Sequence, residues 1–200
     1  MFHEKLPTLE IALPEGGLDP AALFPGSKQV AIEIGYGGGE HLVRQALTHP
    51  DTWFVGCEVF SGGIAKMIEA ITAEDVSNVR LFTDDALKLL VKLPAASLSE
   101  AWLLYPDPWP KSRHHKRRLI QPAFVELAAS RLAPGAYLHV ATDWQEYAEH
   151  VLEVLRANPS LANTVADFAP RPATRPETKF ERRGLKLGHG VWDIVFTRKP

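Results

Sequence analysis

The chain has 200 residues, 46% hydrophobic and 23% charged, the composition of a globular protein with room for one full core. Its 22 lysines and arginines are balanced by 24 aspartates and glutamates, so any nucleic-acid binding must come from local charge rather than from the total. A single cysteine, Cys57, excludes a disulfide framework and a cysteine-rich zinc site. With no signal peptide and no apolar stretch of about 18 residues, the sequence predicts a cytoplasmic protein that does not associate with membranes.

The predicted elements alternate in a regular order. Residues 1–28 are rich in proline and glycine and are expected to form an N-terminal arm ahead of a single domain at 29–200. Strands are predicted at 29–35, 53–59, 79–83, 98–106 and 136–143, and helices at 40–49, 63–72, 86–93, 122–133 and 144–157. This alternation is typical of the α/β class with a doubly wound, mostly parallel sheet. Two further strands, at 163–167 and 190–199, are separated by a long stretch in which no helix is expected, and they predict a closing antiparallel pair in a seven-stranded sheet.

A glycine-rich loop, EIGYGGGEH, joins the first predicted strand to the first helix. Such a turn lets the backbone approach a ligand closely, and the helix N-terminus favours anionic or polar groups. The dinucleotide fingerprint G-x-G-x-x-G is not met, because Glu40 stands where its third glycine would be. The spacing G-x-G-x-G, with Glu33 two residues ahead, instead resembles motif I of class I S-adenosylmethionine-dependent methyltransferases. The other interpretation of the loop is a plain strand-to-helix turn.

Acidic residues follow the predicted strands at the edge where parallel strands end. Glu58 closes the second strand about 20 residues beyond the glycines, where a carboxylate meets ribose hydroxyls in nucleotide sites. Asp84 and Asp85 follow the third strand, where a side chain can reach the amine of an adenine. Glu33 lies inside the first strand and needs a partner if buried, for which the cationic end of the ligand is one candidate. Each acid alone would be an ordinary surface residue, whereas together they predict a nucleotide-like cofactor site.

The densest positive charge follows the fourth predicted strand, in YPDPWPKSRHHKRR at 105–118. The prolines restrict the backbone around Asp107, so this carboxylate is expected to be held in place. Trp109 offers a flat face on which a base can stack. Phosphate binding is expected of the cations that follow, with His114 and His115 extending the same loop: Lys111, Arg113, Lys116, Arg117 and Arg118. The alternative interpretation is a solvated charged loop.

Four segments together resemble the bacterial tRNA (guanine-N7-)-methyltransferase family: EIGYGGGEH, YPDPWPKSRHHKRR, ATDW and RPETKFERRGLKLGHGVWD. The resemblance runs from about residue 29 to the C-terminus, and its second and fourth segments are far more specific than the glycine loop. It implies a Rossmann-like class I methyltransferase fold. It also implies transfer of a methyl group from S-adenosylmethionine to N7 of a guanine in the variable loop of tRNA.

The resemblance further implies which residues form the site. Asp107 falls on the catalytic position of the family. The cofactor positions fall on Glu33, Glu58, Asp85 and Asp107, beside the loop glycines Gly35, Gly37 and Gly39. The substrate positions fall on Lys111, Asp143, Thr178, Lys179, Phe180 and Glu181. The last four belong to a basic stretch at 171–191, which is expected to form a substrate-binding loop over the site.

The chemistry of the reaction limits what Asp107 can do. Guanine N7 carries a lone pair and no proton, so its attack on a sulfonium methyl needs no general base. We therefore expect Asp107 to orient the base or the cofactor and to stabilise the positive charge that develops on the guanine. Asp143 either reads the same base or caps the helix that starts near Trp144, and both roles stay open.

The same sequence also bears on metals, oligomeric state and alternative functions. The histidines show no metal-ligand spacing, so no metal is expected, and the sequence leaves monomer and homodimer open. One alternative function is a class I methyltransferase that acts on a small molecule, which would leave both basic segments unexplained. Another is a non-catalytic RNA-binding protein on the same scaffold, which the acids Glu33, Glu58 and Asp107 argue against.

Overall fold

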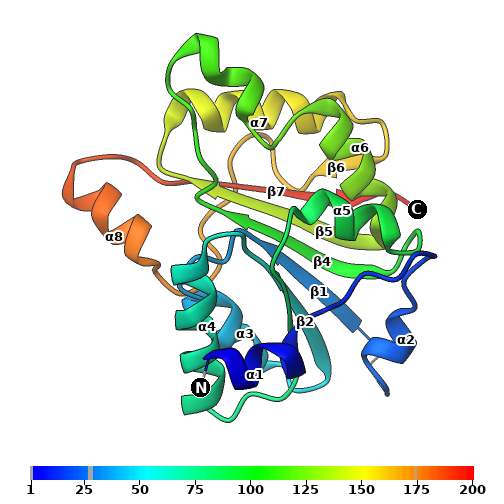
Figure 1. Cartoon of the computed structure of the whole chain (residues 1–200). Helices are drawn as coiled ribbons and strands as arrows, with labels where there is room; N and C mark the ends of the chain where they lie inside the picture. Colours follow the sequence, from blue (N-terminus) through cyan, green and yellow to red (C-terminus); the bar gives the residue numbers. More distant parts are fainter. Residues whose placement is uncertain (1, 27–28, 174) are drawn as a thin grey trace.

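The computed structural model describes residues 2–26, 29–173 and 175–200, and its core is one twisted sheet (Figure 1). The strands lie in the order β3-β2-β1-β4-β5-β7-β6. They are β1 (Gln29–Ile34), β2 (Thr52–Cys57), β3 (Val79–Phe82), β4 (Leu98–Leu104), β5 (Leu132–Thr142), β6 (Leu161–Asn163) and β7 (Trp192–Arg198). Neighbouring strands pair in parallel except around β7, which is antiparallel to both β5 and β6. The predicted doubly wound α/β sheet with a closing antiparallel pair is confirmed.

Helices cover both faces of the sheet (Figure 1). One layer holds α1 (Phe2–Leu9), α3 (Glu40–Thr48) and α4 (Ser61–Ala73), and the other holds α5 (Ala86–Lys92), α6 (Pro122–Arg131) and α7 (Gln145–Ala157). Side chains alternate between these layers along each strand, as the pleat requires. On β1, Ile32 belongs to the core beneath α5, α6 and α7, whereas Ala31 belongs to the core beneath α3 and α4. Within the described ranges, no helix is long and apolar enough to cross a membrane.

Residues 2–26 pack against the domain. They contain α1 and the short helix α2 (Pro20–Leu23). Between these helices the chain runs beside β3, where the Ile11 N–H donates a 2.7 Å hydrogen bond to the carbonyl oxygen of Leu81. Ile11, Leu18 and Phe24 are buried in the core beneath α5. The expected N-terminal arm thus contributes apolar side chains to the main core.

Two expectations about the C-terminal part of the chain are wrong. A helix, α8 (Lys179–Lys186), lies in the stretch where none was expected. It begins at Thr178, whose hydroxyl accepts the Glu181 N–H at 3.2 Å, the spacing of a helix-capping signature. The strand expected at 163–167 lies instead at Leu161–Asn163, because the Asn163 side chain donates to the Asp167 carbonyl oxygen at 2.9 Å and turns the chain.

The order of the strands places a ligand site at one edge of the sheet. From β1 the chain proceeds outward to β2 and β3 and then crosses back to β4 on the other side of β1. At such a switch point the loops after the two central strands diverge and leave a crevice at their carboxyl ends. The loops that diverge here are the glycine loop after β1 and the Asp107 loop after β4.

Candidate active site

The glycine loop has a backbone that only glycine adopts readily. Gly35, Gly37 and Gly39 have φ angles of 75°, 57° and 79°, all in the left-handed region. Gly39 is also the N-cap of α3, and a side chain there would collide with the sulfur of Met67. The three predicted glycines are therefore explained by the conformation of the turn, which brings its backbone to the edge of the sheet.

Glu58 fastens this loop to the next one. One carboxylate oxygen accepts the Gly37 N–H at 2.9 Å, and the other accepts the N–H groups of Val59 and Phe60 at 2.8 and 3.0 Å. These three donors hold the carboxylate at the carboxyl end of β2. A fixed carboxylate beside a close-packed backbone turn suits the hydroxyl groups of a ribose.

The predicted cofactor residues Gly35, Glu58 and Asp85 line one open cleft of about 390 Å³. Asp85 also caps α5, because its carboxylate accepts the Leu87 N–H at 2.9 Å. Val59 and Leu119 form apolar walls of this cleft, and neither was predicted from the sequence, although each directly follows a residue that was discussed there. An apolar side chain directly after a strand-end acid is the signal that could have identified Val59.

Glu33 lies in a smaller cleft on the other side of the glycine loop. It is lined among others by Gly35, His41, Tyr105 and Thr178. The Glu33 carboxylate and the His41 ring are both buried and lie 2.8 Å apart. The partner that the sequence analysis sought for this buried acid is therefore supplied within the protein, by the first turn of α3.

The loop after β4 holds Asp107 exposed between two strained residues. Tyr105 and Trp109 have φ angles of 56° and 44°, which residues other than glycine rarely adopt. Such strain persists only where the surroundings fix the backbone, and it is common at functional sites. The expectation that Asp107 is held in place stays a prediction, and the strained backbone on either side of it supports that prediction.

Arg118 supplies much of that fixation, and this corrects the prediction that it binds phosphate. Its side chain is buried, with 2% exposure for the residue. The guanidinium donates to the Pro108 carbonyl oxygen at 2.9 Å and pairs with Glu146 of α7. It also lies 4.9 Å from the ring centre of Tyr147. Arg118 thus binds the Asp107 loop to α7 from inside the protein.

The remaining cations of the run are exposed and form a positive turn. The short helix η1 (Ser112–Arg117) follows Lys111 and carries Arg113, Lys116 and Arg117. Arg117 lies over the Trp109 ring at 4.9 Å, so this cation covers a ring that was expected to stack a base. The turn presents its charge next to Asp107, which is the arrangement predicted for phosphate binding.

Asp143 does not cap α7, which settles one of its two open roles. The N-cap residue is Trp144, and it has no side-chain cap hydrogen bond. The Asp143 carboxylate lies 3.5 Å from His189 Nδ1 and against the backbone of Gly184 in α8. Asp143 lines a third open cleft of about 390 Å³ together with Trp144, His189 and Trp192.

The described part of the basic stretch at 171–191 contributes Thr178 to the cleft beside Glu33 and His189 to the cleft beside Asp143. Thr178 and Glu181 are both buried there. The side chains of the other two predicted substrate residues, Lys179 and Phe180, lie outside the part of the chain that the structure describes. Among the described residues, no group of three histidine, cysteine, aspartate or glutamate side chains is arranged to hold a metal ion.

Comparison with known proteins agrees with this geometry. A family model described as "Putative methyltransferase" matches residues 27–194. The chain is 48% identical to the tRNA (guanine-N(7)-)-methyltransferase of Chromohalobacter salexigens, over 98% of this chain and 82% of that protein. It is 50% identical to the protein of the same name from Aromatoleum aromaticum, over 99% of this chain and 77% of that one.

The solved structures extend the comparison to the fold. A mutant of the 16S rRNA (adenine(1408)-N(1))-methyltransferase from Catenulisporales acidiphilia, solved with its cosubstrate SAM, has a TM-score of 0.59 at 16% identity, over 92% of each chain. The sheet order and the glycine loop after β1 define a class I methyltransferase. The chain belongs to the tRNA (guanine-N(7)-)-methyltransferase family.

Proposed function

We propose that this protein transfers a methyl group from S-adenosylmethionine to N7 of a guanine in the variable loop of tRNA. The observation that carries the proposal is the proximity in the fold of two features at the carboxyl ends of neighbouring strands. The glycine loop and its cleft follow β1, and the exposed cationic turn follows β4 directly after Asp107. The relatives named above support the choice of tRNA and of guanine N7.

The cleft beside Glu58 has the chemistry that the cofactor requires. Backbone at positive φ in Gly35 and Gly37 allows close approach, Glu58 can accept from ribose hydroxyls, and Asp85 lies across the cleft for an amine. Val59 and Leu119 give apolar walls for a flat ring. When bound, S-adenosylmethionine supplies an electrophilic methyl group for the N7 lone pair.

The residues of the chain then act by position and charge. N7 has no proton to lose, so Asp107 accepts hydrogen bonds and faces the positive charge that forms on the guanine. Arg118 and the surrounding prolines hold Asp107 in a fixed position, and alignment of the reactants itself lowers the barrier by several kcal/mol. Lys111 and the exposed cations of η1 hold the phosphates on either side of the base.

The proposal is tested by cofactor titration and by methyl transfer to two acceptors. Glu58→Ala is expected to weaken S-adenosylmethionine binding by about 1.5–3 kcal/mol, the value of a hydrogen bond to a charged group. Glu69→Ala, which removes an exposed acid from α4, is the matched control and leaves affinity unchanged. Equal methyl transfer to free guanosine and to tRNA would instead indicate a small-molecule methyltransferase, and no cofactor binding at all would indicate an RNA-binding protein.

A further inference from the structure

A row of aromatic and polar side chains crosses one face of the sheet from the glycine loop toward β7. Glu33 of β1 is in register with Trp102 of β4, and Trp102 is in register with His139 of β5. The Trp102 ring lies between two histidine rings, 4.5 Å from that of His41 and 4.7 Å from that of His139. His139 is buried, with its Nε2 atom 2.6 Å from a carboxylate oxygen of Asp193 on β7.

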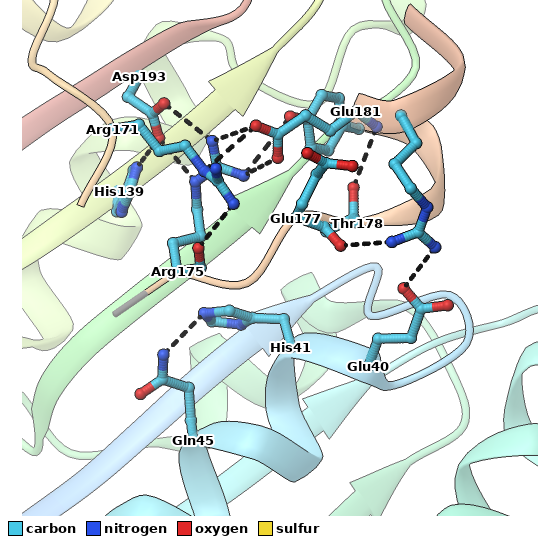
Figure 2. Close-up of polar contacts among 12 residues, drawn as sticks. Glu40, His41, Gln45, His139, Arg171, Arg175, Glu177, Thr178, Glu181 and Asp193 are labelled. Carbon is cyan, nitrogen blue, oxygen red and sulfur yellow. Dashed lines mark hydrogen bonds and ion pairs between the residues drawn. The ribbon is translucent and has the colours of Figure 1, made fainter. Parts of the chain in front are cut away.

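This row ends in an ion cluster that includes a fully buried arginine (Figure 2). The Arg175 side chain is 0% exposed, and its guanidinium meets Asp193 at 3.0 Å on one side and Glu181 at 2.6 Å on the other. Arg171 adds a second contact to Glu181 at 3.2 Å. Burial opposes the charge of Arg175, but the hydrogen bond to Glu181 and the charge of Asp193 outweigh it and raise its pKa.

The ion cluster is positioned to fix Thr178 and the helix α8, which precede β7 in the chain. Arg175 and Glu181 stand three residues before and three residues after Thr178, so their ion pair closes a loop around it. Thr178 then caps α8 and lines the smaller cleft opposite Glu33. At the other end of α8, a side chain added to Gly184 would lie 2.6 Å from Asp143, so the helix rests directly on that residue.

We propose that Arg175 is a positioning residue for the tRNA substrate, which holds Thr178 and α8 at the site by bridging Glu181 to Asp193. Glu181 then acts through Arg175 and not by touching the RNA. The inference rests on the proposed function, because it concerns how the substrate segment of that same site is placed. A buried ion pair suits such a role, since removing one partner leaves an uncompensated charge and releases the segment.

The test compares Arg175→Met, Arg175→Lys and wild type in two measurements. Hydrogen exchange of the amides of α8 reports whether the segment is held, independently of any activity. We expect Arg175→Met to speed that exchange and to raise KM for tRNA by about tenfold or more, while kcat changes less and cofactor affinity stays within about twofold. Arg175→Lys should give an exchange rate of α8 and a KM for tRNA between those of the wild type and Arg175→Met. One ammonium group cannot bridge two carboxylates with the geometry of a guanidinium.

Arg156→Met is the matched control, since it also removes an arginine from an ion pair. Arg156 pairs with Asp167 at 2.8 Å, but both side chains are exposed, at 46% and 71%, and they lie outside residues 171–191. This variant should leave the exchange of α8 and KM for tRNA unchanged. Unchanged exchange and unchanged KM in a folded Arg175→Met protein would overturn the proposal.

A second variant and an assay of the wild type distinguish a failure of this proposal from a failure of the proposed function. If Arg175→Met does not fold, Asp193→Asn carries the same test, because it weakens one side of the bridge and keeps the residue size. Faster exchange of α8 and a raised KM in that variant support the proposal, and wild-type values overturn it. A wild-type protein without methyl transfer to tRNA would refute the proposed function, whereas the exchange measurement would still test the role of Arg175 in holding α8.

Discussion

Gly63→Ala should disable the cofactor site although residue 63 lies in α4 and not in the glycine loop. A Cβ atom at Gly63 would lie 2.5 Å from the carbonyl oxygen of Gly37 and 3.2 Å from Cγ of Glu58. The first contact is with backbone, so it cannot be relieved by rotating a flexible side chain. Ordinary contact begins at 3.4 Å, and the loop must therefore retreat by roughly 1 Å.

The size of the effect follows from what that retreat disturbs. It stretches the 2.9 Å hydrogen bond from Gly37 to Glu58, which as a bond to a charged group contributes about 1.5–3 kcal/mol. Overpacking costs a further 1–3 kcal/mol or so, against about 1 kcal/mol gained by replacing a helical glycine. A misplacement of about 1 Å near the reacting groups lowers the rate by roughly a hundredfold. We expect weaker cofactor binding and a loss in kcat/KM of that order.

The assay is calorimetric titration with S-adenosylmethionine, paired with tRNA methylation kinetics. Gly38→Ala is the matched control within the loop, because no atom lies within 4 Å of the Cβ position there and its φ is outside the left-handed region. That control should bind the cofactor as wild type does. A Gly63→Ala protein with wild-type affinity and rate would refute the claim that the contact between Gly37 and α4 shapes the cofactor site.

Three further predictions concern charge. Neutralising Lys116 and Arg117 together should weaken tRNA binding and flatten its dependence on log salt by about one to two units; an identical slope would make the turn a solvated loop. Arg118→Met should lower kcat by about tenfold and leave the salt dependence of tRNA binding unchanged, because the Arg118 guanidinium holds the Pro108 carbonyl oxygen. A flattened salt dependence would instead show that Arg118 binds RNA phosphate. Burial lowers the pKa of His139 despite its hydrogen bond to Asp193, so the unfolded chain takes up the proton at a higher pH than the folded protein does. The contribution of His139 to stability is then complete above about pH 6.5 and declines as the pH falls below it. In urea unfolding, the free energy of unfolding should therefore fall less between pH 7.5 and pH 5.5 in His139→Gln than in the wild type. An equal fall in both proteins would contradict this assignment.

Much of the fold could be predicted because its signals are local. Strands such as 29–35 are short apolar runs that end in glycine, and their alternation with amphipathic helices specifies a parallel sheet. The helix α8 escaped this reasoning because its sequence KFERRGLK is mostly polar. The spacing of Thr178 and Glu181 is a local signal for the start of this helix. Its ion pairs, those of Glu181 with Arg171 and Arg175 and that of Arg182 with Glu40, appear only in the packed structure.

Some residues of the candidate site could likewise be predicted from the sequence, and others could not. Glycines and strand-end acids could be found, because topology alone brings the ends of parallel strands together. The function of Arg118 could not, since a run of cations does not tell which member points inward to Glu146 and Tyr147. Arg175 likewise reads as one more cation in a basic stretch, and only the packed structure gives it two buried carboxylates.

The central claim is tested most directly by the identity of the methylated nucleoside. Unmodified tRNA is incubated with the protein and S-adenosylmethionine labelled in its methyl group, digested to nucleosides, and resolved by chromatography and mass spectrometry, with Asp107→Ala in parallel. The account predicts label in 7-methylguanosine from the variable loop, and none with Asp107→Ala. Label in any other nucleoside, or undiminished 7-methylguanosine from Asp107→Ala, would contradict it.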